Sequence, residues 1–124
     1  MSDTTRRSFV SSAAVIGAPA VRTAWGQNRP SNEIRLGVVG FRSRGRDHYR
    51  EFAKIPGVKV AFLCDIDERL HPGAVKEIES MGGYRPETFV DLRKMLERKD
   101  LDAISIATPD HWHALQTIWG CQAG

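Results

Sequence analysis

The chain has 124 residues, which suffices for one small domain and is too short for a two-domain enzyme. Hydrophobic residues make up 41% and charged residues 27%, a balance typical of a globular domain rather than a disordered chain. The formal net charge is +3, but residues 1–24 hold three arginines and one aspartate, so the remainder carries only +1. Because no basic tract remains, the composition argues against a nucleic-acid partner.

The first 24 residues have the organisation of an export signal. The paired arginines Arg6 and Arg7 precede a mostly small and apolar run, residues 12–21, as in signals read by the twin-arginine export machinery. This run is too short to span a bilayer, which takes about 20 apolar residues. We expect residues 1–24 to be a twin-arginine signal peptide, residues 25–32 a linker, and the mature protein periplasmic or otherwise extracytoplasmic. The alternative for the first segment is a disordered, arginine-containing tail.

Short apolar runs then alternate with segments of helical periodicity. The predicted strands are residues 34–39, 58–64, 88–89 and 103–107, and the predicted helices are residues 46–55, 71–81, 90–98 and 111–122. Such alternation indicates a parallel sheet with helices on both faces, and right-handed crossovers favour the strand order 3-2-1-4. The predicted fold class for residues 33–124 is therefore α/β, an incomplete Rossmann-type doubly wound sheet of about four strands. Its ligand should bind at the carboxyl ends of the first and fourth strands.

The segment Gly40-Phe41-Arg42-Ser43-Arg44-Gly45 joins the first predicted strand to the first helix. It matches Gly-x-Gly-x-x-Gly at the first and third glycines, with Arg42 at the second. The first glycine permits a tight turn, and the third permits close packing of helix and strand. Amide groups at the helix start can then face a pyrophosphate, and the Arg42 guanidinium can pair with a phosphate. The alternative is a glycine-bounded turn with solvated arginines.

Asp65 lies 20 residues after Gly45, at the carboxyl end of the second predicted strand. An acid at this position can accept hydrogen bonds from the adenosine ribose hydroxyls of a dinucleotide, and it repels the 2′-phosphate of NADP. The predicted cofactor is therefore NAD, with NADP disfavoured. The alternative for Asp65 taken by itself is a helix-cap or turn aspartate.

Four side chains are expected in the core. Cys64 and Cys121 lie in apolar segments, and two cysteines are too few for a disulfide framework or a metal site, so both are expected to be buried thiols. Trp112 and Trp119 are seven residues apart in the last predicted helix, a spacing that places both on one helix face.

Several segments resemble the opening of Gfo/Idh/MocA oxidoreductases. They are residues 34–40, 44–48 (Arg-Gly-Arg-Asp-His), 63–67 (Leu-Cys-Asp-Ile-Asp) and 100–114, which contain Ala-Thr-Pro-Asp-His-Trp-His. The resemblance covers essentially all of residues 33–124, and the Ala-Thr-Pro-Asp-His-Trp-His segment is its most specific part. Exported members of the family often carry similar twin-arginine leaders.

The resemblance implies roles for matching positions around a dinucleotide. Gly40 and Gly45 would frame the pyrophosphate loop, Asp65 would bind the adenosine ribose, and Thr108, Pro109 and His113 would lie beside the nicotinamide.

Local alternatives exist near the last helix. Thr108 could be the N-cap of that helix, and Asp110 an acid favoured by the helix dipole. His111 is expected to be a solvated residue at the helix start.

The family transfers hydride between a nicotinamide and a substrate carbon, usually of a sugar or polyol. Its members continue with a Glu-Lys-Pro motif, whose lysine is catalytic, and a second α/β domain. This chain ends before both, so we assign no catalytic residue and expect dinucleotide binding without turnover. Residues 103–107 would then form an exposed sheet edge, which favours self-association, marginal stability and weak cofactor affinity.

Three other functions remain open from the sequence. Some relatives of the same fold are NAD-dependent glycosidases that oxidise, eliminate and reduce back, and the residues that separate them from dehydrogenases lie outside this chain. A non-catalytic nucleotide-binding or partner-binding module is a second alternative. A signalling receiver-type domain is a weaker third, because only Asp65 and Asp67 offer the acidic cluster at strand ends that it would need.

Overall fold

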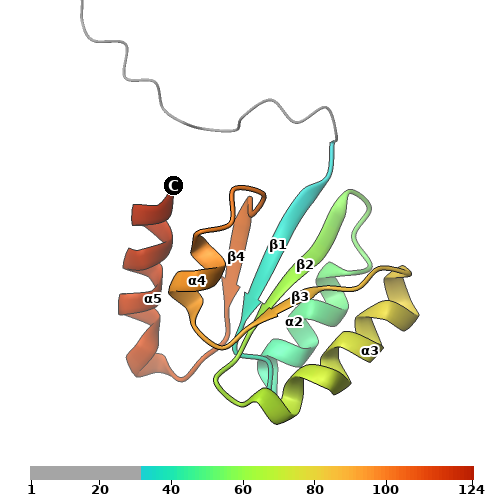
Figure 1. Ribbon diagram of the computed structural model, residues 1–124, viewed down its shortest axis with the longest axis horizontal. Coiled ribbons are helices and arrows are strands. Elements are labelled where there is room, and N and C mark those ends of the chain that lie inside the picture. Colours follow the sequence, from blue (N-terminus) through green and yellow to red (C-terminus); the bar gives the residue numbers. More distant parts are fainter. Residues whose placement is uncertain (1–31) are drawn as a thin grey trace, which may run out of the picture.

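The computed structural model describes residues 32–124, and the predicted signal peptide and nearly all of the predicted linker lie outside this range. In chain order the elements are β1 (Ile34–Val39), α2 (Arg44–Phe52), β2 (Val58–Cys64), the 3-10 turn η1 (Glu68–Leu70), α3 (His71–Gly82), β3 (Glu87–Phe89), α4 (Leu92–Leu96), β4 (Ala103–Ile106) and α5 (Asp110–Ala123). The four strands form one parallel sheet with the order β3-β2-β1-β4 (Figure 1). The predicted Rossmann-type topology is confirmed.

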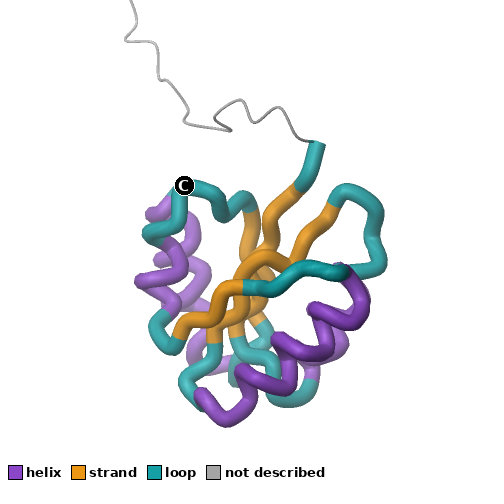
Figure 2. The backbone as a smooth tube through the Cα atoms, turned by 45° about the vertical axis from the view of Figure 1, so that its right-hand side comes forward, coloured by secondary structure: helices purple, strands orange, loops and turns teal. Residues whose placement is uncertain are grey.

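Helices cover both faces of the sheet, α2 and α3 on one side and α4 and α5 on the other (Figures 1 and 2). The apolar side chains of β1 and β2 are shared between these two layers. Val38 packs with the α2–α3 layer and its neighbour Val39 with the α4–α5 layer, and each is at most 2% exposed. A strand buried on both faces needs a continuous apolar run, which is why β1 and β2 were predictable from the sequence.

The bounds of β1 and β2 agree with the prediction, whereas helix ends differ by a few residues. Helix α2 begins at Arg44, two residues before its predicted start, and ends at Phe52, three residues before its predicted end. Helix α3 ends at Gly82, where Gly83 adopts the left-handed conformation at φ +68° and its amide bonds to the Glu79 carbonyl. In the part of the chain that the structure describes, no helix is long and apolar enough to cross a membrane.

Two predictions about the core of α5 are wrong. Trp112 is 46% exposed, and Cys121 is exposed, whereas Cys64 is buried in the core and Trp119, partly buried, packs against it as expected. The cause is the short length of α4, which has only five residues and faces the second half of α5, next to Trp119. Trp112 lies in the first turn of α5, and its ring lies against that of the exposed His111.

Candidate functional site

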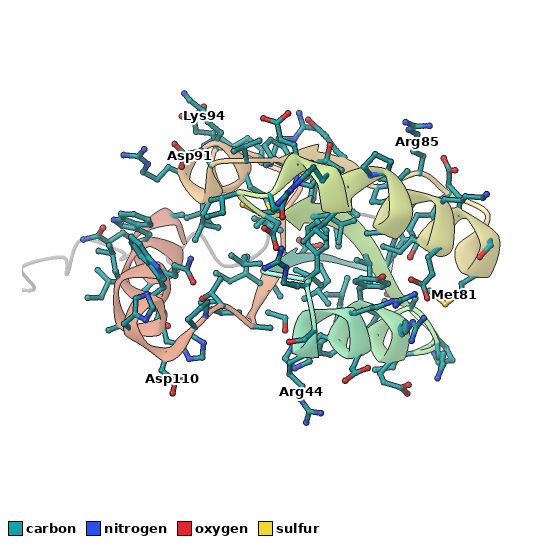
Figure 3. The ribbon with its side chains drawn as sticks, turned by 90° about the horizontal axis from the view of Figure 1, so that it is seen from below. Arg44, Met81, Arg85, Asp91, Lys94 and Asp110 are labelled. Atoms are coloured by element: carbon teal, nitrogen blue, oxygen red, sulfur yellow. The ribbon has the colours of Figure 1, made fainter. Side chains whose placement is uncertain are left out.

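The loops that follow β1, β2 and β4 meet at the carboxyl edge of the sheet. The Gly40 amide donates to the Cys64 carbonyl at 2.8 Å, which joins the first two loops. A Cβ atom on Gly40 would lie 2.8 Å from Thr108 Cγ2, so the third loop lies directly against the first. Figure 3 views this edge, and Arg44 and Asp110, the first residues of α2 and α5, project outward from it. The predicted switch point between β1 and β4 is therefore a real junction of loops.

Both glycines of the predicted fingerprint are required by the backbone. Gly40 has φ +76°, a left-handed conformation that side chains disfavour. A Cβ atom on Gly45 would collide with the Gly40 carbonyl oxygen and would lie 3.3 Å from the Ala107 Cβ atom. Helix α2 can therefore approach the end of β1 only because position 45 has no side chain. These are the turning and packing roles expected of the first and third glycines.

The start of α2 supplies donors for an anion. The first four amides of a helix have no partner within the helix, and Ser43, the N-cap residue, provides no side-chain hydrogen bond to them. The Arg46 amide bonds to the Ser43 carbonyl at 3.0 Å, which leaves the amides of Arg44 and Gly45 at the tip. The positive end of the helix dipole lies at the same tip. The residues of this loop thus fit a diphosphate group.

Asp65 lies at the base of this loop, close to the helix tip as predicted. Its carboxylate accepts the Phe41 amide at 3.0 Å through Oδ2 and the Asp67 amide at 2.9 Å through Oδ1. Asp65 therefore shapes the glycine loop as well as facing it, a role that the sequence pattern does not reveal. A carboxylate offers about four acceptor positions. Two of these acceptor positions on Asp65 therefore remain for the hydroxyl groups of a ribose.

An ion cluster lies beside Asp65. Asp67 accepts two hydrogen bonds from the Arg69 guanidinium, at 2.8 and 2.9 Å, and one from Arg42 Nη2 at 3.1 Å. The hydrogen bonds from Arg69, with the charge of Arg42 as a smaller cause, lower the pKa of Asp67 to about 2, so its carboxylate is ionised at neutral pH. Arg42, predicted to meet a phosphate, is thus engaged by a carboxylate of the neighbouring loop, although its side chain is 73% exposed.

His71 also borders the site. Its Nε2 lies 2.8 Å from the Asp65 carbonyl oxygen, to which it donates, and its ring lies against that of Phe41, with 5.5 Å between ring centroids. Phe41 is itself buried in the core, so only its backbone borders the loop surface. Nothing in the sequence pattern marks His71 beyond its place at the start of a predicted helix.

Thr108, Pro109 and His113 lie together at the β4–α5 loop. Thr108 Oγ1 donates to Gln116 Oε1 at 2.5 Å, and His113 Nε2 donates to the Thr108 carbonyl at 2.6 Å. Thr108 is therefore not the helix cap, because Pro109 occupies that position and makes no side-chain cap. Gln116 is buried in α5 and holds the threonine that contacts Gly40. A polar residue on the buried side of this helix was the signal that could have identified this contact.

The remaining surface features lie elsewhere. Cavities of about 260 and 130 Å³ lie along α4, β4 and α5, and none of the predicted site residues lines them. Within residues 32–124 there is no cluster of three or more histidine, cysteine, aspartate or glutamate side chains that could hold a metal ion.

Comparison with known proteins places the chain among sugar-active relatives. A glycosyl hydrolase family 109 protein of Stenotrophomonas maltophilia is 30% identical over 128 aligned residues, which cover 96% of this chain and 28% of that protein. An alpha-N-acetylgalactosaminidase of Shewanella oneidensis is 30% identical over 95 residues, covering 73% of this chain and 21% of that protein. No protein-family model matches the chain.

Solved structures of dehydrogenases share the fold. Scyllo-inositol dehydrogenase of Lactobacillus casei, solved with NAD(H) and scyllo-inositol, is 26% identical with a TM-score of 0.62, over 74% of this chain and 26% of that chain. The WlbA dehydrogenase of Bordetella pertussis, solved with NADH and UDP-GlcNAcA, is 29% identical with a TM-score of 0.59, over 74% of this chain and 27% of that chain. The chain thus spans about a quarter of the length of the relatives that it matches.

Proposed function

Since this chain belongs to the Gfo/Idh/MocA family, we propose that its residues 32–124 bind a nicotinamide dinucleotide, with NAD preferred over NADP. The observation that carries the proposal is the contact of the Asp65 carboxylate with the Phe41 amide, which joins the glycine loop to the acid after β2. This contact brings a diphosphate cradle and a ribose acceptor within reach of one ligand. The bound NAD(H) of the Lactobacillus and Bordetella dehydrogenases supports the same cofactor class.

Each predicted residue then has a physical task. The amides at the tip of α2 hold the pyrophosphate, Gly40 and Gly45 give it room, and Asp65 accepts the ribose hydroxyls. Thr108 and His113 fix the β4–α5 loop beside Gly40, where the nicotinamide half would extend. When bound, the nicotinamide supplies hydride transfer, and the protein supplies position.

Titration of the full chain with NAD in a calorimeter tests this function. We expect saturable binding that weakens about tenfold or more in Asp65→Asn, because a hydrogen bond to a charged group contributes roughly 1.5–3 kcal/mol. Asp102→Asn is the matched control, since the Asp102 carboxylate also accepts a backbone amide of the β1 segment, that of Arg35 at 2.8 Å, but at the opposite end of the strand. Absence of NAD binding by folded wild-type chain, or equal losses in the two variants, would refute the proposal.

For the whole protein we propose hydride transfer on a sugar or polyol, with substrate and acid-base groups supplied by parts of the relatives that this chain does not match. By itself the chain is proposed to bind dinucleotide without turnover. A glycosidase that uses bound NAD is the second candidate, and the glycosyl hydrolase family 109 relatives favour it. Assaying a full-length protein on a polyol and on an N-acetylgalactosaminide distinguishes the two, because only the glycosidase returns its NAD unchanged after each cycle.

We further propose that residues 1–24 direct export of the folded protein by the twin-arginine machinery. The alignment with the Stenotrophomonas protein covers 96% of this chain and therefore extends into residues 1–31, which supports a shared leader. Fusing residues 1–31 to a reporter tests this idea. Export should be lost when Arg6 and Arg7 are both replaced by lysine, and export of the lysine variant through the general secretory route would contradict it.

Finally, we propose that the chain self-associates through its α5 side. Trp112, Leu115 and Ile118 lie exposed at helical spacing on α5, next to the edge strand β4.

A further inference from the structure

Asp67 joins the two loops that the proposed function assigns to the dinucleotide. Its carboxylate holds Arg42, from the loop after β1, and Arg69, from the turn after β2. Asp67 is in turn fixed by its own amide, which donates to Asp65 Oδ1 at 2.9 Å. Two cations and two carboxylates are thus packed together at the position where the adenosine ribose would lie.

A second aspartate in the molecule shows which part of this cluster is ordinary. Asp91 caps α4, accepts the Arg93 amide and holds the Arg93 guanidinium through two hydrogen bonds, at 3.0 and 2.7 Å. Asp67 makes the same set of bonds with Arg69, two residues on. The Asp-x-Arg arrangement is therefore a local capping motif in this fold. What is particular to Asp67 is its second partner residue, Arg42, 25 residues away in the glycine loop.

Arginine near the ribose acid is the feature that accommodates a 2′-phosphate in dinucleotide-binding folds. A phosphate monoester carries about −1.5 to −2 charges at neutral pH, and guanidinium groups bind it with paired hydrogen bonds. Arg42 and Arg69 are two such groups beside Asp65, and both are bonded to Asp67. Counting one negative formal charge for each aspartate and one positive formal charge for each arginine, the four side chains sum to no net charge, so the cluster offers a 2′-phosphate little attraction.

We propose that Asp67 is a specificity-determining residue that withholds Arg42 and Arg69 from a 2′-phosphate and so sets the preference for NAD over NADP. The inference rests on the proposed dinucleotide function and assigns its selectivity to a residue outside the ribose contact itself. Loss of the Asp67 charge leaves the cluster at +1 and frees two guanidinium groups. Asparagine keeps the Oδ1 acceptor that caps the Arg69 amide, so the turn can persist while the charge is lost.

The test is to measure the dissociation constants of NAD and NADP for the full chain and for Asp67→Asn, by calorimetry. We expect NADP to bind about tenfold tighter in the variant, the size of a charge-assisted hydrogen bond, while NAD changes by about twofold or less. The gain should shrink as salt screens the exposed arginines. It should vanish when Arg42→Ala and Arg69→Ala are added to Asp67→Asn.

Asp91→Asn is the matched control, because it removes the same capping charge from a carboxylate that binds Arg93 and is not bonded to Arg42, and it should leave the ratio of the two constants unchanged. If the wild-type chain binds NAD but Asp67→Asn leaves the ratio of the NAD and NADP dissociation constants unchanged, or weakens the binding of both nucleotides equally, the inference is overturned and the proposed function stands. If folded wild-type chain binds neither nucleotide, both are overturned. The shorter probes 2′,5′-ADP and ADP should reproduce the change in ratio, since the inference concerns the adenosine end alone.

Discussion

The two faces of the sheet are covered by helices to different degrees. On the α2–α3 face, Tyr49 is buried in the core and its hydroxyl donates at 2.6 Å to Glu77 of α3, which also binds Arg46 and Arg50. On the α4–α5 face, α5 leaves large apolar side chains uncovered, with Ile118 52% exposed. The glycine loop and Asp65 are built on the first face. The chemistry of binding therefore depends on the closed side of the molecule, and the close approach of Gly40 to Thr108 and of Gly45 to Ala107 connects it to the loop that leads into α5.

The largest effect should come from filling the space at Gly45. Gly45→Ala places a methyl group against the Gly40 carbonyl and Ala107, so α2 must move away from β1, and we expect a loss of about 3 kcal/mol in the free energy of unfolding. Gly73→Ala is the control, because Gly73 lies in the first turn of α3 with no atom within 4 Å of its Cβ position. It should be neutral or stabilise by up to about 1 kcal/mol. Urea unfolding of both variants measures this, and equal effects would remove the argument for close packing at position 45.

A smaller effect should follow from cutting the link between α2 and α3. Tyr49→Phe keeps the buried ring but removes the hydroxyl group that donates to Glu77, and we expect a loss of about 1–2 kcal/mol in the free energy of unfolding. Burial, with the hydrogen bond to Glu77 as a further cause, raises the pKa of Tyr49 to about 12, so the hydroxyl remains protonated through the usable pH range. Tyr84→Phe is the comparison, since its hydroxyl accepts a single backbone bond from Val60 at 3.0 Å. A Tyr49→Phe variant as stable as wild type would show that the hydrogen bond between Tyr49 and Glu77 does not stabilise the closed face.

The fold was predictable because its strands are buried on both sides. Continuous apolar runs marked β1 and β2, Gly40 and Gly83 marked turns with a positive φ, and Gly45 marked the close approach of α2 to the end of β1. The proximity of Asp65 to the loop followed from topology alone, since parallel strands end at one edge.

What the sequence could not reveal depends on distances between separate elements. The bond from Arg42 to Asp67 spans 25 residues and no motif encodes it. The exposure of Trp112 follows from how far α4 extends along α5, and helical spacing within α5 carries no information on that length. The Thr108–Gln116 bond likewise requires knowing which side of α5 faces the loop.

On the open face we expect a change in assembly rather than in folding. Trp112→Gln removes an exposed aromatic side chain, so the free energy of unfolding should change by about 0.5 kcal/mol or less. Self-association should weaken if α5 forms the contact, which sedimentation velocity at several concentrations measures. Ile55→Gln, an exposed apolar residue beyond the end of α2, is the control and should leave assembly unchanged. A wild-type chain that stays monomeric at all concentrations would contradict the proposed α5 contact.

The smallest effect distinguishes the two capping aspartates by pH. The pKa of Asp67 is lowered from 3.8 to about 2, chiefly by Arg69 and with a further contribution from Arg42, and the pKa of Asp91 is lowered by Arg93. A carboxyl whose folded pKa lies below its unfolded value stabilises the fold above the unfolded pKa, and that stabilisation is lost as pH falls through the folded pKa.

The stability difference between wild type and Asp67→Asn should therefore be constant above about pH 5 and disappear between about pH 4 and pH 2. For Asp91→Asn the difference should likewise be lost as pH falls, because the hydrogen bonds from Arg93 lower the pKa of Asp91. Unfolding midpoints from pH 7 to 2 at low salt measure both. Adding Arg42→Ala should move the Asp67 profile to a slightly higher pH, because the charge of Arg42 contributes to lowering the pKa of Asp67, and it should leave the Asp91 profile in place. An Asp67 profile that Arg42→Ala does not move would mean that Arg42 does not bind Asp67 in solution.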